Sequence, residues 1–435
     1  MKLKRIMAAV LTAVLALTAF FGSALPVNAA GLADLKSLLS GGGAKEKEME
    51  EEKEKGMVER SLVQTGNVFR LKKAIEKARN GEDVTIAYIG GSITEGASAS
   101  VHEKSYAYAS FKEFSKLYAK DTKKMHYVNA GMSGTPSSLG IMRYQRDVLE
   151  AAETAPDIVV IEFAVNDNNE ATKSKAFEGM VRNILNAENA PAVILMFSVF
   201  QNGLWNMQST YIPIGEAYGL PMVSIKDAIS PEITSGAMKN EDFFASDGWH
   251  PLDFGHQIMT DCMVNLFKNA DAAREPLKDA AFPKKPVYGA DYENLLVLDR
   301  LSANEYDGVT LTEGSFSETD TITGSFAYSK KQKLPDNFKH GKNSGSQPLT
   351  VKLTCKNFLF SYKLSSAKNT LGKAEIYVDG ELVKTVNGYN AGGWNNPETI
   401  EVFNNEEAAE HTVEIRMAKD SENLEFTVLL MGFSV

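Results

Sequence analysis

Ser92 is the residue of this sequence best placed to act as a nucleophile. It follows Gly90 and Gly91, which end a short apolar run at residues 84–89. Such a run is typical of a strand buried on both faces, and two glycines allow the backbone to turn sharply after it. Open α/β sheets bind ligands at the carboxyl ends of strands, where Ser92 would be exposed. The alternative for this segment alone is a strand-to-helix turn in which Ser92 only caps the next helix.

Asp247 and His250 lie three residues apart in the segment SDGWHP at residues 246–251. A serine hydroxyl is a weak nucleophile unless a histidine accepts its proton, and that histidine needs a carboxylate to fix its tautomer. The spacing allows the carboxylate and the imidazole to lie side by side in one tight loop. Ser92, His250 and Asp247 are therefore the candidate catalytic residues for acyl transfer.

Hydrogen-bond donors for the oxyanion of a tetrahedral intermediate are expected in two further loops. The segments NAGMSG at residues 129–134 and AVND at residues 164–167 each follow a strand pattern. The backbone N–H groups of Ser92 and Gly134 and the side-chain amide of Asn166 are the candidate oxyanion-hole donors. Because the carboxyl ends of parallel strands share one edge of a sheet, these distant residues are expected to converge there.

Strand and helix patterns alternate through the first half of the chain. Five buried strand patterns lie at residues 84–89, 126–130, 157–163, 192–199 and 221–225, and helical patterns lie at 68–78, 106–118, 139–152, 177–187, 212–218 and 253–267. This alternation predicts an α/β fold, a three-layer α/β/α sandwich with a parallel five-stranded sheet. We expect the domain to span residues 66–270.

The second half of the chain changes character. Residues 271–290 contain Pro276, Pro283 and Pro286, which favour an extended linker. Period-two runs over residues 291–435 then predict a C-terminal all-β sandwich, with Asp379 and Gly380 as a two-residue hairpin turn. This domain either binds glycan as an accessory module or only supports the catalytic domain.

Three tryptophans are candidate substrate-binding residues. Trp205 and Trp249 lie in loops near the expected site, and Trp394 lies in a loop rich in glycine and asparagine at residues 388–397. Indole faces stack on sugar rings, and amides pair with hydroxyls. The alternatives are that Trp249 is a buried prop for His250 and that Trp394 closes the end of the sandwich core.

Residues 1–30 have the pattern of a secretory signal peptide. Lys2, Lys4 and Arg5 precede an apolar run at residues 6–21, and small residues predict cleavage near Ala29 or Ala30. The run is shorter than the roughly 20 residues that span a bilayer, so we expect a secreted, extracellular protein without membrane insertion after cleavage. Residues 31–65 contain a glycine triplet and a run of charges, which predict a flexible tether.

The composition argues against several classes of partner and cofactor. The formal net charge is −10, which disfavours nucleic acid and anionic membranes. Cys262 and Cys355 are the two cysteines, so no disulfide framework is expected and both are predicted to be buried and unpaired. The histidines lack metal-ligand spacing, so we expect no metal site. The oligomeric state does not follow from the sequence.

Four segments resemble the signature blocks of the SGNH hydrolases, also called GDSL esterases and lipases. The segment 90–94 is similar to the GDSxT serine block, with Gly91 in place of aspartate. Ser133 and Gly134 match the glycine block, AVND is similar to GxND with Ala164 in place of glycine, and Asp247 to His250 match the DxxH block. The resemblance covers residues 66–268 and implies a Ser-His-Asp ester hydrolase without a cofactor.

Within that family, the chain looks most like secreted carbohydrate esterases with an appended β-sandwich. This resemblance implies removal of O-acetyl groups from an acetylated polysaccharide or oligosaccharide, such as plant xylan or mannan. One alternative is a lipid or aryl esterase of the same fold. The other is a glycan-binding protein with a vestigial esterase site.

Overall fold

The computed structural model describes residues 55–435, except 169, 275–277, 284, 303–304 and 329. The expected signal peptide at residues 1–30, its cleavage site and most of the expected tether at residues 31–65 therefore lie outside the described residues. Met57–Val435 form one compact unit. The two domains within this unit are both built around sheets.

The first sheet contains the five predicted parallel strands. Its order is β1-β6-β5-β4-β2-β3, and its parallel members are β2 Val84–Gly90, β3 Met125–Gly131, β4 Ile158–Glu162, β5 Ala192–Phe197 and β6 Met222–Ser224. Gly90 at the end of β2 pairs with Gly131 on β3 and with Glu162 on β4. The carboxyl ends of β2, β3 and β4 are thus level with one another, which brings their following loops to one edge.

A sixth strand extends the sheet beyond the expected boundary. β1 Leu62–Gln64 pairs antiparallel with β6, and Ser224 donates a backbone hydrogen bond to the carbonyl of Ser61. Residues 55–60 before it are helical. The α/β domain therefore begins before residue 66. The sequence did not indicate this strand because its three residues are too few to show a periodic pattern.

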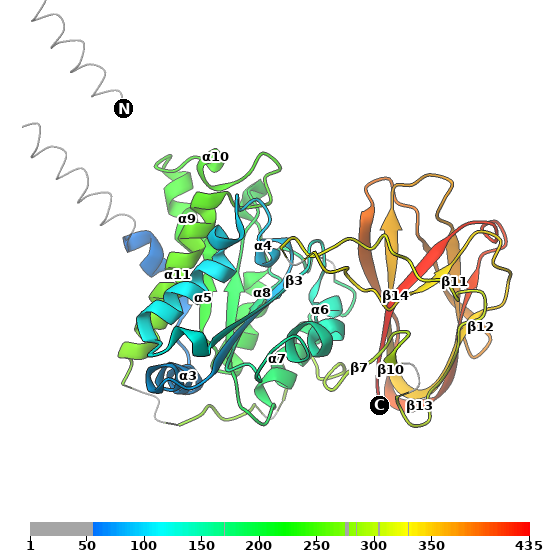
Figure 1. Ribbon diagram of the computed structural model, residues 1–435, viewed down its shortest axis with the longest axis horizontal. Coiled ribbons are helices and arrows are strands. Elements are labelled where there is room, and N and C mark those ends of the chain that lie inside the picture. Colours follow the sequence, from blue (N-terminus) through cyan, green and yellow to red (C-terminus); the bar gives the residue numbers. More distant parts are fainter. Residues whose placement is uncertain (1–54, 169, 275–277, 284, 303–304, 329) are drawn as a thin grey trace, which may run out of the picture. The chain divides into compact units, whose positions relative to one another are not determined.

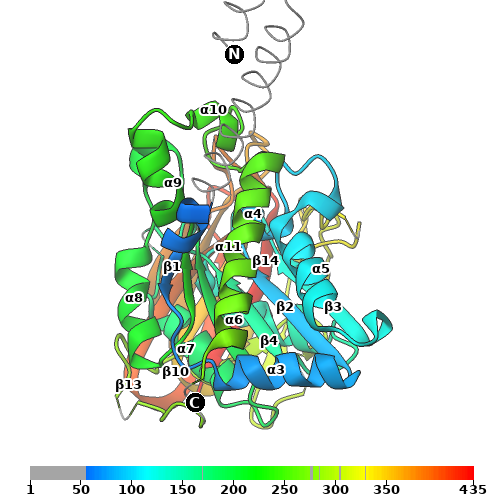
Figure 2. The same cartoon turned by 90° about the vertical axis from the view of Figure 1, so that its left-hand side faces the viewer.

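Helices cover both faces of this sheet, as the alternation predicted (Figure 1). Ile86 and Tyr88 of β2 pack on one face with α3 Phe69–Asn80, α5 Tyr106–Tyr118, α9 Ile225–Thr234 and α11 Asp253–Ala272. Ala87 and Ile89 pack on the other face with α6 Ser137–Tyr144, α7 Lys175–Leu185 and α8 Gln208–Ala217. Helices α3, α5 and α11 face the viewer in Figure 2. Two one-turn helices, α4 Ser92–Glu95 and α10 Asn240–Phe243, lie in the loops.

The second sheet forms the predicted C-terminal β-sandwich. Its strands are β7 Leu296–Leu298, β8 Thr310–Thr312, β9 Phe338–His340, β10 Leu349–Ser365, β11 Lys373–Val378, β12 Glu381–Asn387, β13 Trp394–Met417 and β14 Phe426–Ser434. All of their pairings are antiparallel. Asp379 and Gly380 have φ values of 53° and 87°, as a type I′ hairpin turn between β11 and β12 requires.

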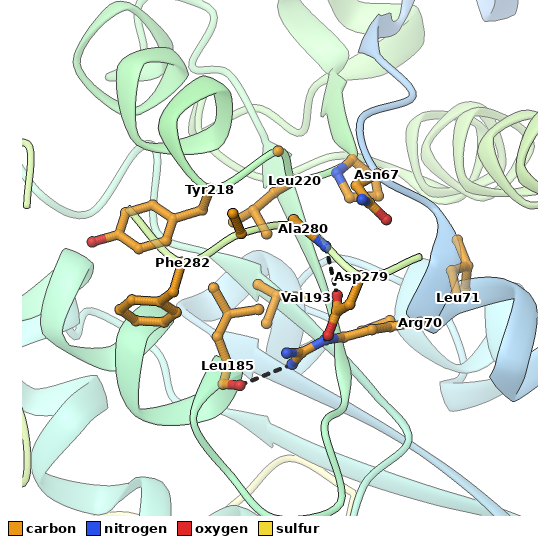
Figure 3. Close-up of a pocket in the computed structure, with 14 residues that line it drawn as sticks. Asn67, Arg70, Leu71, Leu185, Val193, Tyr218, Leu220, Asp279, Ala280 and Phe282 are labelled. Atoms are coloured by element: carbon orange, nitrogen blue, oxygen red, sulfur yellow. Dashed lines mark hydrogen bonds and ion pairs between the residues drawn. The ribbon is translucent and has the colours of Figure 1, made fainter. Parts of the chain in front are cut away.

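The segment between the domains is hydrogen-bonded to the α/β domain. The buried carboxylate of Glu178 on α7 accepts backbone N–H bonds from Val287, Tyr288 and Gly289 at 2.7, 2.6 and 3.1 Å. Figure 3 shows Asp279 in an ion pair with Arg70 beside a small pocket. That pocket has a volume of only about 30 Å³ and lies at the amino ends of β5 and β6, away from the edge that carries Ser92.

The two domains share a hydrophobic core. Leu359 on β10 and Leu429 and Leu430 on β14 belong to the same buried cluster as the inner faces of α6 and α7. A Cβ on Gly432 would lie 3.2 Å from Met142 on α6, so the two elements are in close contact. The C-terminal domain is therefore packed against the α/β domain rather than joined to it only by a linker.

Candidate active site

Glycines and a short helix set the position of Ser92. A Cβ on Gly90 would lie 2.3 Å from Thr94 Oγ1 and 2.4 Å from the carbonyl oxygen of Glu162, so only glycine fits where β2 turns. The turn continues into α4, which ends at Glu95 and is followed by the C-cap residue Gly96 with φ +98°. Ser92 is the first residue of α4, at the carboxyl edge of the sheet.

The structure brings Ser92, His250 and Asp247 into hydrogen-bonding contact. Ser92 Oγ lies 2.8 Å from His250 Nε2, and His250 Nδ1 lies 2.7 Å from Asp247 Oδ2. Asp247 Oδ1 also accepts the backbone N–H groups of Trp249 and His250. Burial acts to raise the pKa of Asp247, but these hydrogen bonds outweigh burial and hold the pKa below its ordinary value. Asp247 is therefore a carboxylate that can fix the Nδ1–H tautomer of His250.

The loop that carries Asp247 and His250 is held by its own backbone. The N–H of Ala245 donates to the carbonyl of His250 at 2.8 Å, and the N–H of Gly248 donates to the carbonyl of Ala245 at 2.9 Å. Gly248 has φ +72°, which favours glycine at this position. The N–H of Gln201 donates to the Gly248 carbonyl from a neighbouring loop. The imidazole is thus aimed at Ser92 by a closed turn.

The three expected oxyanion donors are backbone N–H groups and a side-chain amide at the carboxyl edge of the sheet. Within the described residues, no group accepts a hydrogen bond from the N–H of Ser92, the N–H of Gly134 or the Nδ2 of Asn166. A Cβ on Gly91 would lie 2.2 Å from Asn166 Oδ1, so any side chain at residue 91 would displace the Asn166 amide.

A buried carboxyl group that sequence reasoning missed lies beneath the nucleophile turn. Glu162 at the end of β4 accepts hydrogen bonds from the hydroxyls of Thr94 and Ser198 and from the N–H of Gly91. Burial raises the pKa of Glu162 to about 7. A glutamate inside the otherwise apolar pattern DIVVIEF is the signal that could have identified it.

The tryptophans lie on the rim of the site. Trp249 and Trp394 have exposed fractions of 57% and 56%, so neither is a buried prop or a closure of the core. A Cβ on Gly134 would lie 2.7 Å from Trp394 Cζ2, so the indole contacts the backbone of an expected oxyanion donor. The ring of Phe200 lies 6.3 Å from those of Trp205 and Trp249, which makes a second aromatic surface beside His250.

The remaining expectations concern cysteines, metals and membranes. Cys262 and Cys355 are buried and unpaired. In the part of the chain that the structure describes, no group of three or more acidic, histidine or cysteine side chains could hold a metal ion. None of the helices in that part is long and apolar enough to cross a membrane.

Comparisons with known proteins match part of the α/β domain to a protein family and both domains to solved structures. Residues 88–258 match the GDSL-like lipase/acylhydrolase family. The chain is similar to the crystal structure of a two-domain esterase active on acetylated mannans, with 27% identity and a TM-score of 0.72, over 87% of this chain and 98% of that chain. A structure of a two-domain esterase active on acetylated mannans co-crystallised with mannopentaose gives 27% identity, a TM-score of 0.71 and the same coverage. A search of curated proteins gives no match.

Proposed function

Because this chain contains a domain of the GDSL-like lipase/acylhydrolase family and is a carboxylic ester hydrolase, we propose that it removes O-acetyl groups from polysaccharide. We place acetylated mannan first among the substrates and acetylated xylan second. The preference for mannan rests on the likeness to the two-domain mannan esterase, which extends through both domains. The proposal includes secretion, supported by the basic, apolar and small-residue pattern of residues 1–30.

The proposed mechanism begins with attack by Ser92. Its hydroxyl loses a proton to His250 Nε2, 2.8 Å away, as Oγ adds to the acetyl carbonyl carbon. The carbonyl oxygen then carries negative charge, which the N–H groups of Ser92 and Gly134 and the amide of Asn166 stabilise. Asp247 stabilises the imidazolium that forms and keeps its ring in position.

The intermediate then collapses to an acetyl-enzyme. His250 gives its proton to the departing sugar oxygen, and the C–O bond of the ester breaks. A water molecule next loses a proton to His250 and attacks the acetylated Ser92 through the same oxyanion site. The products are acetate and a free hydroxyl on the glycan, and the enzyme returns to its starting state.

The main support for this proposal is the contact of Ser92 with His250, whose ring in turn contacts the carboxylate of Asp247. The exposed indoles of Trp394 and Trp249 support a carbohydrate substrate, because flat aromatic faces stack on the apolar faces of sugar rings. Trp394 comes from the C-terminal domain and Trp249 from the catalytic loop. A glycan chain held between the domains would therefore present its acetyl groups to Ser92.

Acetate release from matched polymers tests the proposed function. We expect the highest kcat/KM on acetylated mannan oligosaccharides, lower values on acetylated xylan, and little turnover of a long-chain aryl ester. Equal turnover of long-chain and acetyl esters would instead support a lipid esterase. A preference for acetylated xylan would move the proposal to that polymer.

A further inference from the structure

Glu95 ends the helix that begins with Ser92 and reaches the loop that carries Gly134. Its carboxylate oxygen Oε2 accepts the N–H of Ser133 at 2.8 Å and also the Ser133 hydroxyl. A Cβ on Gly131 would lie 2.1 Å from the backbone nitrogen of Glu95, so the helix touches the end of β3, immediately before this loop. Glu95 thus joins the nucleophile turn to the expected oxyanion loop.

The same carboxylate is also held by a hairpin of the C-terminal domain, which we call the arm (residues 325–333, of which 329 is not described). Lys333 Nζ lies 2.8 Å from Glu95 Oε1, and the N–H of Ala327 donates to Oε1 at 3.0 Å. The side chains of Glu95 and Lys333 are 7% and 9% exposed. The Tyr328 hydroxyl donates to the carbonyl of Gly96 at 3.0 Å, immediately after the nucleophile helix.

The arm and the α/β domain also leave a hollow beside these polar contacts. A cavity of about 340 Å³ lies between them, lined by Phe326, Ala327 and Tyr328 on one side and by Tyr127 and Asn129 on the other. Burial acts to raise the pKa of Glu95, but the charge of Lys333 and the hydrogen bonds of Lys333 and Ser133 outweigh burial and lower the pKa. Glu95 is therefore an acceptor for each of its partners.

We propose that Glu95 is a positioning residue for the oxyanion loop and that Lys333 of the C-terminal arm fixes Glu95 in that role. Anchoring both the N–H and the hydroxyl of Ser133 restrains the peptide that joins Ser133 to Gly134. The N–H of Gly134 is then aimed by the C-terminal domain, although no residue of the arm touches the reacting atoms. Oxyanion stabilisation depends steeply on such placement of donors. This inference requires only ester hydrolysis and not a polysaccharide substrate.

The test uses the full-length protein and a small soluble aryl acetate. Lys333→Met removes the cation and keeps a long side chain, and it should lower kcat about 10-fold with little change in KM, because the affected contact forms in the transition state. Affinity for a small alkylboronic acid, which mimics the tetrahedral intermediate, should fall by a similar factor. Lys333→Arg, which restores the charge, should recover most of kcat.

Arg182→Met is the matched control. Arg182 on α7 pairs with Glu293 of the C-terminal region at 2.7 Å, with side chains 13% and 17% exposed, so this ion pair also links the two halves of the chain but lies away from α4. It should lower the melting temperature and leave kcat unchanged. Wild-type kcat in Lys333→Met, or an equal loss of kcat in Arg182→Met, overturns the proposal.

A second variant covers the case in which Lys333→Met does not fold. Ser133→Ala removes one of the contacts to Glu95 and no buried charge. A lower kcat with unchanged KM and unchanged melting temperature supports the positioning role, and an unchanged kcat overturns it.

Discussion

The indole of Trp394 in the C-terminal domain lies against the backbone of Gly134 in the α/β domain, and a Cβ on Gly134 would come within 2.7 Å of it. Gly134 has φ +69° and a backbone N–H that donates to no described group. One residue of the β-sandwich thus borders the loop that is expected to stabilise the oxyanion. The candidate site is therefore made by both domains.

Replacing Trp394 tests whether this contact serves substrate binding. Trp394→Ala should lower kcat/KM on acetylated mannan oligosaccharides about 5-fold, because loss of an aromatic stacking surface costs about 1 kcal/mol. The loss should appear mainly in KM and should be smaller for a small aryl acetate. Leu382→Ala, at an exposed position of β12 in the same domain, is the control and should change neither value. Equal losses on the polymer and on the aryl acetate would contradict a glycan-binding role.

Asn166 provides a separate test of the oxyanion site. Asn166→Ala should lower kcat by about 10² to 10³ with a smaller effect on KM, because its amide would bind charge that appears only in the transition state. Steady-state kinetics with an aryl acetate measures both constants. A variant changed only in KM would assign Asn166 to substrate binding.

Truncation tests whether the α/β domain depends on the hydrophobic core that it shares with the C-terminal domain. A chain ending at Gly289 would expose the α6 and α7 surfaces that now pack on Leu359, Leu429 and Leu430. It would also lose the contact of Lys333 with Glu95. We expect it to be aggregated or inactive even on a small aryl acetate, as judged by size-exclusion chromatography and turnover. A soluble truncated protein with the full-length rate would show that the C-terminal domain is dispensable for the chemistry.

His256 should give the folded protein a defined pH dependence. Its buried ring accepts the N–H of Tyr106 at Nδ1 and faces the carbonyl of Ala97 at Nε2, and burial lowers its pKa from 6.5 to about 4. The unfolded chain therefore binds a proton between about pH 6.5 and 4 that the folded protein does not, so stability falls as pH falls through this window. The slope should approach about 1.4 kcal/mol per pH unit.

Chemical denaturation of wild type and His256→Gln at several pH values measures this slope. The difference in stability between the two proteins reports on His256. Burial raises the pKa values of Glu162 and Asp167 to about 7, so protonation of these two groups favours the folded state as pH falls. This opposite effect is present in both proteins and cancels in the difference. A difference in stability that does not vary between pH 4 and 6.5 would contradict the assignment.

The main strands were predictable because each is a continuous buried run with a glycine or polar loop after it. Strands β1, β7, β8 and β9 were not predicted because each has three residues and, unlike β6, none is buried throughout. The long strand β10 does not show as one pattern in the sequence, because the polar Lys356 and Asn357 interrupt its apolar alternation. A register shift between Cys355 and Asn357 lies at that interruption, where the strand is irregular.

The candidate site was predictable where its residues follow strands and not where it depends on packing between domains. Ser92, Asn166 and His250 could be placed at one sheet edge because parallel topology fixes which ends converge. Glu95 and Lys333 lie 238 residues apart in the sequence, and no local pattern links them. The contact of Trp394 with Gly134 likewise depends on how one domain packs on another.

The central claim is that Ser92 is the nucleophile that carries the acetyl group. Rapid acid quenching of the full-length enzyme with excess acetylated mannan oligosaccharide, followed by peptide mass spectrometry, tests it most directly. We expect one added acetyl group on the peptide that contains Ser92, no such peptide in Ser92→Ala, and loss of nearly all acetate release in that variant. An acetyl group on another residue, or acetate release by Ser92→Ala at a tenth of the wild-type rate or more, would contradict it.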